Sequence, residues 1–468
     1  MSNVQEFGAV GDGIHDDTAA IQHALNEGDG CVWFPRGDYK IVRPLLVDLT
    51  KFGRRAIRGE GGTARIAMYG AGPAILLRAS HGATADPGSF REEEWQHERM
   101  PTVADIEIVG HHQEADGIEI RGVMQPTLTG VLIRRVRHAV HVVERARNII
   151  IDHCHFYHNT GAGVFLDGVN LHQSIICSSH ISYCRLGGIR IEGSEIRNLQ
   201  ITGNDIEYNN NASHGIEGAD GVATAEIYID VGDAGEGSIR EGTISSNTIQ
   251  ATDSPNGANI RIIGNRKLGS HRAGMWTITG NLIGSQRQNV HLRWVRGVTL
   301  TGNYIYSSHE RNLLVQHSRN IVVGSNVFGH NPDYDKKELA TGIRFEDSHS
   351  CNLHGNVIED AEAGTHTVET VPLERLGLIE LERCQRMSIT GTQILDPTPC
   401  GLHIRDCDDL LIQGCTIHDA REKMAMTTPI DWQGKATTGL ISGCRIGRGT
   451  GGGMVVPENV TVEGNAIQ

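Results

Sequence analysis

The chain has 468 residues, of which 58 are glycine and only 5% are aromatic, and its formal net charge is −14 at pH 7. This is the composition neither of a disordered chain nor of a membrane protein, and the acidic balance argues against a nucleic-acid partner. No stretch approaches the roughly 18 uncharged apolar residues of a membrane span, so no membrane association is expected.

The N-terminus and the cysteines bear on the compartment. The first residues lack a basic region followed by an apolar core, which predicts a cytoplasmic protein, or a secreted one if a leader has been removed. The ten cysteines form no CxxC pair. We therefore expect buried free thiols, with neither disulfides nor a zinc site.

The first hundred residues begin with "FGAVGDGIHDDTAAIQHALNEG" at residues 7–28. This pattern predicts a short strand, a glycine turn, and a helix that begins at Asp16 or Asp17. Its apolar face carries Ala20, Ile21 and Leu25. An amphipathic helix at this place can close the open end of a stacked repeat. We therefore predict an N-terminal cap with irregular first turns over residues 1–100.

From residue 101 onward a phrase such as "VTLTGNYIYS" recurs, with 21 to 23 residues between the closest copies. Each copy alternates apolar and polar residues and then breaks at glycine, which is typical of strand–turn–strand units. Repeats of this length suit leucine-rich horseshoes or parallel β-helices. The leucine-rich consensus is absent, so we predict an all-β, right-handed parallel β-helix over residues 101–468, continuous with the cap. Its bends carry a ladder of Asn204, Asn247, Asn281, Asn303, Asn326 and Asn356.

The N-terminal segment "FGAVGDGIHDDTAAIQHAL", with "VWFPRGDYKI" and "IRGEG" after it, closely resembles the start of the pectate-lyase-like β-helix superfamily. That superfamily includes polygalacturonases, phage tailspike glycanases, alginate epimerases and inulin fructotransferases. The resemblance implies a carbohydrate substrate and a homotrimer, but it does not fix one reaction. We expect Asp12, Asp16 and Asp17 to be turn and cap residues.

A second strand of the form G-I-x-I-x lies between consecutive bends, and its x positions should point outward. Two outer columns follow, with neighbours about 4.8 Å apart. The first column is Glu119, His141, Phe165, Arg190, Tyr228, Arg261, His291, Leu314, Arg344, Glu380 and His403. The second column is Arg121, Val143, Asp167, Glu192, Asp230, Ile263, Arg293, Gln316, Glu346, Glu382 and Arg405.

Asp167, Glu192 and Asp230 are consecutive in the second column. Three stacked carboxylates repel, so arginines, a cation or protonation must compensate. Carboxylates whose pKa values are pushed apart suit glycosidic-bond cleavage, with Asp230 and Glu192 as the preferred pair. A solvated charged face with arginine partners is the alternative explanation.

The longest interval between bends spans this cluster. Its insertion, "EYNNNASHGIEGADGVAT", carries His214, Glu217 and Asp220 as candidate substrate-binding residues. Long loops on a rigid scaffold are usually functional, so this one is predicted to wall a cleft. Glu241, just past the turn after Asp230, is an additional catalytic candidate.

The outer columns also carry cationic and aromatic residues. Candidate substrate-binding residues are Arg190, Tyr228, Arg261, His291 and Arg293, and spaced guanidinium groups favour an acidic saccharide. No cofactor is expected. A lyase would use calcium, which Asp167, Glu192 and Asp230 could hold.

These observations predict a glycoside hydrolase that acts on a poly- or oligosaccharide. The alternatives are a polysaccharide lyase, or a fructotransferase or epimerase of the same fold. The non-enzymatic alternative is a trimeric carbohydrate-binding or structural β-helix. Trp276, Trp294 and Tyr304, expected to be exposed in successive coils, could pack against a neighbouring subunit.

Overall fold

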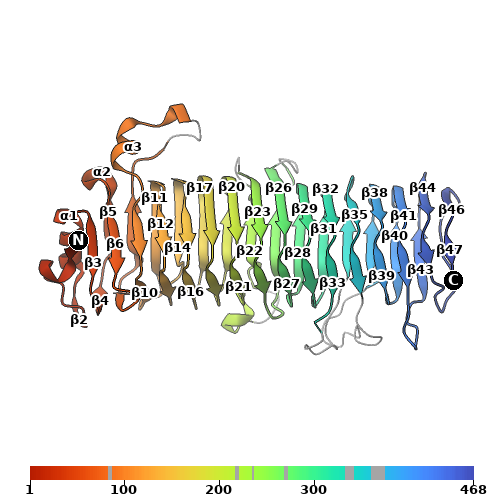
Figure 1. Ribbon diagram of the computed structural model, residues 1–468, viewed down its shortest axis with the longest axis horizontal. Coiled ribbons are helices and arrows are strands. Elements are labelled where there is room, and N and C mark those ends of the chain that lie inside the picture. Colours follow the sequence, from red (N-terminus) through yellow and green to blue (C-terminus); the bar gives the residue numbers. More distant parts are fainter. Residues whose placement is uncertain (83–86, 217–220, 234–236, 268–271, 332–341, 360–374) are drawn as a thin grey trace. The chain divides into compact units, whose positions relative to one another are not determined.

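The computed structural model describes residues 1–82, 87–216, 221–233, 237–267, 272–331, 342–359 and 375–468. It divides into two compact units, Met1–Thr243 and Ile244–Gln468. Within each unit, short strands of successive coils pair in parallel, which makes each unit a right-handed parallel β-helix as the spacing predicts (Figure 1). The strands of successive coils form three faces, named here the first, second and third face, and a full coil such as β5, β6 and β7 places one strand on each.

Unit 1 is built from the following strands. The first face contains β5 (Leu45–Asp48), β8 (Gly72–Arg78), β11 (Ala115–Met124), β14 (Val140–Arg147), β17 (Ala162–Cys177), β19 (Gly187–Glu192) and β22 (Thr224–Asp230). The ends of β11, β14 and β17 continue onto the second face, with β1 (Ser2–Asn3), β3 (Cys31–Phe34), β6 (Ala56–Gly59), β9 (Thr102–Ala104), β12 (Thr127–Thr129), β15 (Ile150–Asp152), β20 (Glu195–Thr202) and β23 (Ser238–Ser245). The third face holds β2 (Asp12–Asp16), β4 (Gly37–Ile41), β7 (Ala64–Met68), β10 (Glu107–Gly110), β13 (Leu132–Arg134), β16 (His155–Tyr157), β18 (His180–Ser182) and β21 (Asp205–Glu207).

Unit 2 repeats this arrangement. Its first face has β25 (Gly257–Ile263), β28 (Gln288–Arg293), β31 (Arg311–Gln316), β34 (Ile343–Glu346), β37 (Ile379–Glu382), β40 (Cys400–Arg405) and β43 (Thr428–Gln433). Its second face has β26 (Ala273–Thr279), β29 (Arg296–Thr301), β32 (Arg319–Gly324), β35 (Asn352–His354), β38 (Gln385–Thr390), β41 (Asp408–Gln413), β44 (Gly439–Ser442) and β46 (Val460–Glu463). Its third face has β24 (Thr248–Gln250), β27 (Leu282–Gly284), β30 (Tyr304–Tyr306), β33 (Val327–Gly329), β36 (Val357–Glu359), β39 (Gln393–Leu395), β42 (Thr416–His418), β45 (Arg445–Ile446) and β47 (Ala466–Ile467).

The helices of the described residues are short and belong to unit 1: η1 (Val4–Phe7), α1 (Thr18–Glu27), α2 (Leu49–Phe52), η2 (Pro87–Ser89), α3 (Glu92–His97) and η3 (Ala212–His214). Helix α1 contacts β3 and β5, and its Ile21, Ala24 and Leu25 are buried. Among the described residues no helix is long and apolar enough to cross a membrane.

The aspartates before α1 act in turns and caps, as predicted. The Asp16 carboxylate accepts a hydrogen bond from Thr18 N (3.0 Å). Asp17 is 2% exposed and accepts from Val10 N (2.6 Å) and Gly11 N (3.0 Å). These contacts satisfy backbone donors of the turn and of the helix start.

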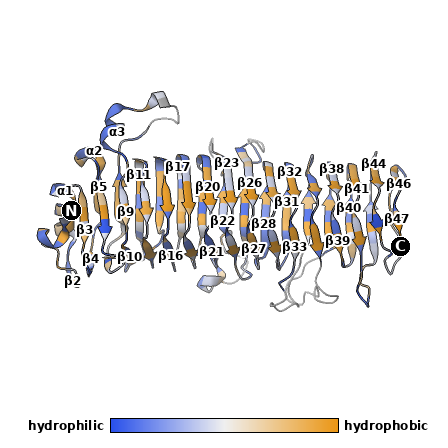
Figure 2. Cartoon of the chain, in the orientation of Figure 1, coloured by the Kyte–Doolittle hydropathy of each residue, from blue (hydrophilic) through white to orange (hydrophobic). Residues whose placement is uncertain are grey.

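Alternation of apolar and polar residues places aliphatic columns inside each unit, and Figure 2 shows the strands striped accordingly. On the first face of unit 1, Ile118, Val140, Val164, Ile189 and Ile227 lie in register and are fully buried. Parallel pairing already runs through β1, β3, β6 and β9, so stacked strands lie on both sides of residue 100. The boundary at that residue stays a prediction.

The predicted asparagine ladder is present. In unit 2 the backbone N–H of Asn281 donates to Asn303 Oδ1 (3.0 Å), while Asn281 Nδ2 donates to Ile244 O (3.0 Å). In the last coils sulfur replaces the amide, because Cys415 N donates to Cys444 Sγ (3.4 Å). The ten cysteines are free thiols, and all except the half-buried Cys31 and Cys177 are buried as expected.

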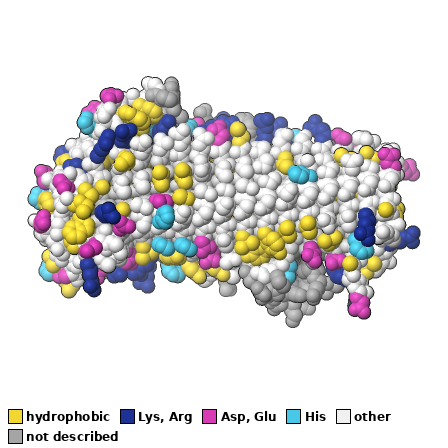
Figure 3. Space-filling view, in the orientation of Figure 1, with side chains coloured by type: hydrophobic (Ala, Val, Ile, Leu, Met, Phe, Trp, Pro, Cys, Tyr) yellow, Lys and Arg dark blue, Asp and Glu magenta, His cyan; other side chains and the backbone are white. Residues whose placement is uncertain are grey.

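The prediction that Trp276 is exposed is wrong. Met275 has a left-handed φ of 56°, which breaks the period-2 alternation, and Trp276 is 1% exposed in register with the buried Val298. Tyr304 is 43% exposed and lies in a third-face row with Leu282 and Val327, which are 41% and 37% exposed. Figure 3 shows hydrophobic side chains gathered over this part of unit 2.

Candidate active site

The first face of unit 1 has the predicted register. The pairing of β14, β17, β19 and β22 aligns His141, Phe165, Arg190 and Tyr228 in the first column. The same pairing aligns Val143, Asp167, Glu192 and Asp230 in the second column. The three carboxylates are therefore consecutive neighbours, as the repeat spacing predicts.

Each carboxylate of this row has its own partner. Asp167 Oδ2 lies 3.1 Å from His141 Nε2. Glu192 forms an ion pair with Arg190. Asp230 accepts hydrogen bonds from Gly232 N (2.8 Å) and from the Tyr228 hydroxyl (3.2 Å). Protein groups thus supply the compensation that the stacked charges require.

Asp230 differs from the other two carboxylates in its electrostatic environment. Burial raises the pKa of Asp230, the hydrogen bonds from Gly232 and Tyr228 oppose the rise, and the charges of Glu192 and Asp233 add to it. A raised pKa favours the protonated acid. The neighbouring Glu192 instead forms an ion pair with the guanidinium of Arg190. The two adjacent carboxyl groups therefore lie in unequal environments.

The prediction that the first column is exposed is wrong in this part of the chain. Phe165, Arg190 and Tyr228 are only 9%, 5% and 6% exposed. The reason is stacking between coils: the Arg190 guanidinium lies 4.2 Å from the centre of the Tyr228 ring. Arg190 also donates to Leu186 O (2.8 Å) and Ala223 O (3.3 Å). Arg190 therefore orients Glu192 and is too enclosed to present an open guanidinium to a substrate.

His141 also belongs to the site, although the sequence pattern alone does not single it out. Its ring stacks on Phe165, with centroids 5.3 Å apart and planes 6° from parallel. Its Nδ1 atom is buried and has no hydrogen-bond partner among the described residues. The adjacent His138 accepts from Ala162 N (3.1 Å), and burial lowers the pKa of His138 to about 4, so that ring is neutral. The repeat pattern predicts that His141 points outward. It does not predict the contact with Asp167, because Asp167 lies on the next coil and in the other column.

The other unit 1 candidates lie apart from this row. His214 in η3 has Nε2 2.8 Å from Tyr183 O. Glu217 and Asp220 lie outside the described residues. Glu241 lies on the second-face strand β23 with a φ of 65°, and its carboxylate is 3.9 Å from Arg197 Nε. Glu241 therefore pairs with Arg197 on the second face, whereas Asp230 lies on the first face.

Arg261, His291 and Arg293 belong to unit 2. Arg261 Nε donates to His291 Nδ1 (3.2 Å), and His291 Nε2 lies 3.1 Å from Gln316 Oε1. Burial lowers the pKa of His291 to about 3, so the expectation of a cationic His291 is wrong. The Arg293 guanidinium stacks 4.0 Å from the Trp294 ring.

Further along the first face of unit 2, charged residues neutralise one another. The Arg344 guanidinium binds Glu346 (2.5 Å), Glu380 (2.6 Å) and Glu382 (2.5 Å). Glu380 also pairs with the buried Arg311 at 2.9 Å. This network matches the alternative in which outer arginines serve as partners of column carboxylates, so Arg344 is not free for an acidic substrate.

Calcium does not fit the carboxylate row. The described residues contain no group of three or more His, Cys, Asp or Glu arranged to hold a metal ion. Asp167, Glu192 and Asp230 each already accept from a nitrogen or hydroxyl donor, whereas calcium needs six to eight oxygen ligands. The absence of a cofactor requirement stays a prediction.

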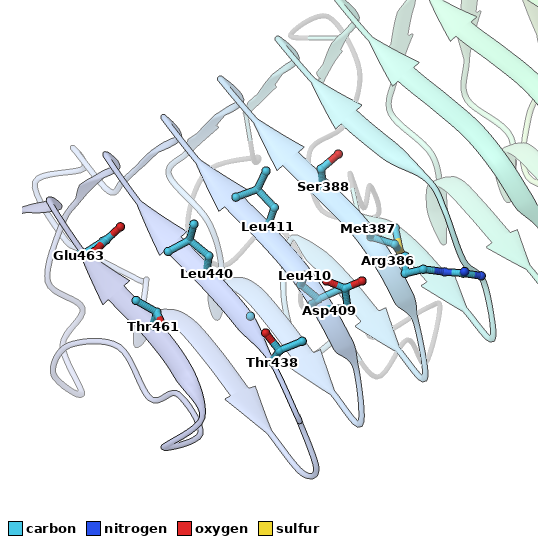
Figure 4. Close-up of a pocket in the computed structure, with 11 residues that line it drawn as sticks. Arg386, Met387, Ser388, Asp409, Leu410, Leu411, Thr438, Leu440, Thr461 and Glu463 are labelled. Carbon is cyan, nitrogen blue, oxygen red and sulfur yellow. The ribbon is translucent and has the colours of Figure 1, made fainter.

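The three carboxylates of the row line none of four cavities of about 370 to 600 Å³ in the described part of the chain. One cavity of about 600 Å³ opens on the second face of unit 2, between residues of β38, β41, β44 and β46. Figure 4 shows Leu411 and Leu440 in its middle and the charged Arg386 and Glu463 at opposite ends. Its two lining carboxylates, Asp409 and Glu463, lie on strands two coils apart, so the carboxylate row remains the candidate active site.

Residues 1–239, just over half of the chain, match the family model described as rhamnogalacturonase A/epimerase, pectate lyase-like. Residues 236–375 match a second model, described as periplasmic copper-binding protein (NosD).

Short segments match curated proteins. Mannuronan C5-epimerase AlgE5 of Azotobacter vinelandii is 51% identical over 43 residues, which span 8% of this chain and 4% of that protein. Plasmin and fibronectin-binding protein A of Streptococcus pneumoniae is 50% identical over 44 residues, which span 8% of this chain and 6% of that protein. Among solved structures, the Dettilon tailspike protein aligns with a TM-score of 0.46 and 12% identity over 89% of this chain and 66% of that one.

Proposed function

Because the chain belongs to the rhamnogalacturonase A/epimerase, pectate lyase-like family, we propose that it is a carbohydrate-active enzyme that cleaves glycosidic bonds in a poly- or oligosaccharide. The observation that carries this proposal is the unequal environment of two neighbouring carboxyl groups. Burial raises the pKa of Asp230, while Glu192 forms an ion pair with Arg190. Glycosidases use one protonated and one ionised carboxyl group in this way.

We assign the roles from these two environments. Asp230 donates its proton to the leaving glycosidic oxygen, and the Tyr228 hydroxyl and Gly232 N–H keep its carboxyl group in position. Glu192 acts either as the nucleophile or as the base that activates water. Asp167 supplies the next negative charge in the row, tied to His141.

A lyase or epimerase acting on uronate sugars is the second candidate, and Tyr228 favours it. Its hydroxyl donates a hydrogen bond to Asp230, and the guanidinium of Arg190 lies over its ring. Such a group suits removal or delivery of a proton at a sugar carbon. The matched mannuronan C5-epimerases fit this alternative by name.

One experiment separates these activities. The protein is incubated with neutral and uronate-containing polysaccharides, and reducing ends, absorbance of unsaturated uronates and epimer composition are measured together. The hydrolase proposal predicts new reducing ends without unsaturated products. Tyr228→Phe should then keep most of the turnover, whereas a lyase or epimerase should lose it.

The remaining outcome is that no product of any kind forms. Binding to a polysaccharide without turnover would favour the non-enzymatic alternative, a carbohydrate-binding or structural β-helix. A positive control with a known glycosidase on the same panel guards against unsuitable substrates.

A further inference from the structure

A second site lies one corner away from the carboxylate row, on the second face of unit 1. A cavity of about 450 Å³ opens there, lined by Ser80, His81, Gly122, Glu144, Arg145 and Asn170 among others. Strand β14 reaches it by turning at Glu144, whose φ is 61°. Helix α3 stands out from the coils on this side of the unit (Figure 1).

Arg145 is the cationic residue of this cavity, and it is only 7% exposed. Its Nε donates to His81 Nε2 (3.4 Å), and its Nη1 donates to Asn170 Oδ1. Both acceptors are neutral, because burial lowers the pKa of His81. The remaining nitrogen, Nη2, is buried and has no hydrogen-bond partner among the described residues.

The carboxylates nearby are bound to other cations. Glu94 pairs with Arg91 (2.5 Å), and Glu144 pairs with Arg121 (2.9 Å). Glu195 lies 3.6 Å from Arg197.

No described carboxylate forms an ion pair with Arg145. Burial, together with the charge of Arg147, lowers the pKa of Arg145, and Glu195 opposes this only in part. A buried charge without a counterion is costly, and so is a buried donor without an acceptor. Arg145 meets both conditions inside a cavity large enough for a small ligand.

We propose that this cavity binds an oxyanion, the carboxylate, sulfate or phosphate group of a ligand, through the unpartnered Nη2 of Arg145. Guanidinium groups recognise such oxyanions with charge-assisted hydrogen bonds. The site is separate from Asp230 and Glu192, and it does not depend on the reaction proposed for them.

The test is a binding measurement on the full chain. Melting temperature and calorimetric titration are recorded with sodium galacturonate, sodium sulfate and sodium phosphate, each against sodium chloride at equal ionic strength. At least one of the three salts should raise the melting temperature more than sodium chloride does. The anion of that salt identifies which oxyanion the cavity prefers. If none does, the proposal is overturned.

Three variants tie the binding to this cavity. Arg145→Gln should weaken it about tenfold or more, the loss expected for a charge-assisted hydrogen bond. Asn170→Asp keeps Arg145 but places a carboxylate against its Nη1, which supplies a counterion. It should therefore weaken oxyanion binding as well. If Arg145→Gln fails to fold, the binding measured for Asn170→Asp tests the proposal. Arg134→Gln, a matched arginine paired with Glu107 on the third face, should bind as the wild type does. Unchanged binding in Asn170→Asp, or in a folded Arg145→Gln, would place the oxyanion elsewhere.

Discussion

Glu226 makes the stability of unit 1 sensitive to pH. It lies on β22 and is fully buried. Its carboxyl group accepts hydrogen bonds from Asn209 N (2.8 Å) and Asn209 Nδ2 (2.5 Å). Burial raises the pKa of Glu226 from 4.5 to about 8, the Asn209 hydrogen bonds oppose the rise, and the charges of Glu207 and Asp205 add to it. Glu226 is therefore protonated in the folded protein at neutral pH.

The sign of the pH effect follows from proton linkage. Between pH 4.5 and about 8 the folded protein keeps a proton on Glu226 that the unfolded chain has lost. The contribution of Glu226 to the free energy of unfolding is then fully present below pH 4.5 and is lost as the pH rises toward 8. A shift of 3.5 pH units corresponds to about 5 kcal/mol at about 1.4 kcal/mol per unit, as an upper bound. That loss is a large fraction of the stability of an ordinary domain.

Glu226→Gln removes the ionisable group and keeps an oxygen that can accept from Asn209. We expect the variant to be somewhat less stable than the wild type at pH 5, because the new amide hydrogens lack an acceptor. It should be more stable at pH 8.5, where the wild type buries a charge. Urea unfolding at half-unit pH steps measures this crossover, with the exposed Glu114→Gln as control. Parallel pH profiles for wild type and Glu226→Gln would refute the reasoning.

Three further predictions concern the site and the assembly. Asp230→Asn and Glu192→Gln should each lower turnover by about 10²-fold or more without loss of melting temperature. The exposed Glu463→Gln, on the second face of unit 2, should change neither. Full activity in both row variants would show that the row is structural. Chelator treatment should leave activity and melting temperature unchanged, and restoration of a lost activity by calcium would favour a lyase. Light scattering should give about three times the chain mass of 50.9 kDa, as expected for a homotrimer. If the exposed Tyr304 lies in the contact between subunits, Tyr304→Glu should yield the monomer. A wild-type mass near 50.9 kDa would contradict the trimer.

The repeat pattern by itself determines the coil, the strands and the register. Alternation with period 2 decides which side chains face inward, and glycine and asparagine mark each bend, so the alignment of Asp167, Glu192 and Asp230 follows from the spacing between bends. The asparagine ladder follows in the same way, because residues at equal places in successive coils must stack. These are local properties that each copy of the repeat carries.

Local exceptions to the pattern are decided by the backbone of particular coils. The left-handed conformation of Met275 turns Trp276 inward against the alternation. The first column is covered because Arg190 stacks over Tyr228, one coil away, and bonds to backbone carbonyls of two neighbouring segments. Alternation with period 2 predicts neither effect, because it assigns every outward-pointing side chain to the exposed surface.

Charge compensation is the property that only the tertiary structure decides. The sequence shows that Asp167, Glu192, Asp230 and Arg145 are present, but their partners come from other coils or from rotamers that packing selects. Asp167 meets His141 across 26 residues, and Glu226 meets Asn209 across 17. Among the described residues Arg145 has no carboxylate partner, because the nearby carboxylates are held by other arginines. Repeat spacing fixes backbone positions along the coil, whereas the protonation state of each buried group depends on burial and on which partner comes within hydrogen-bonding distance.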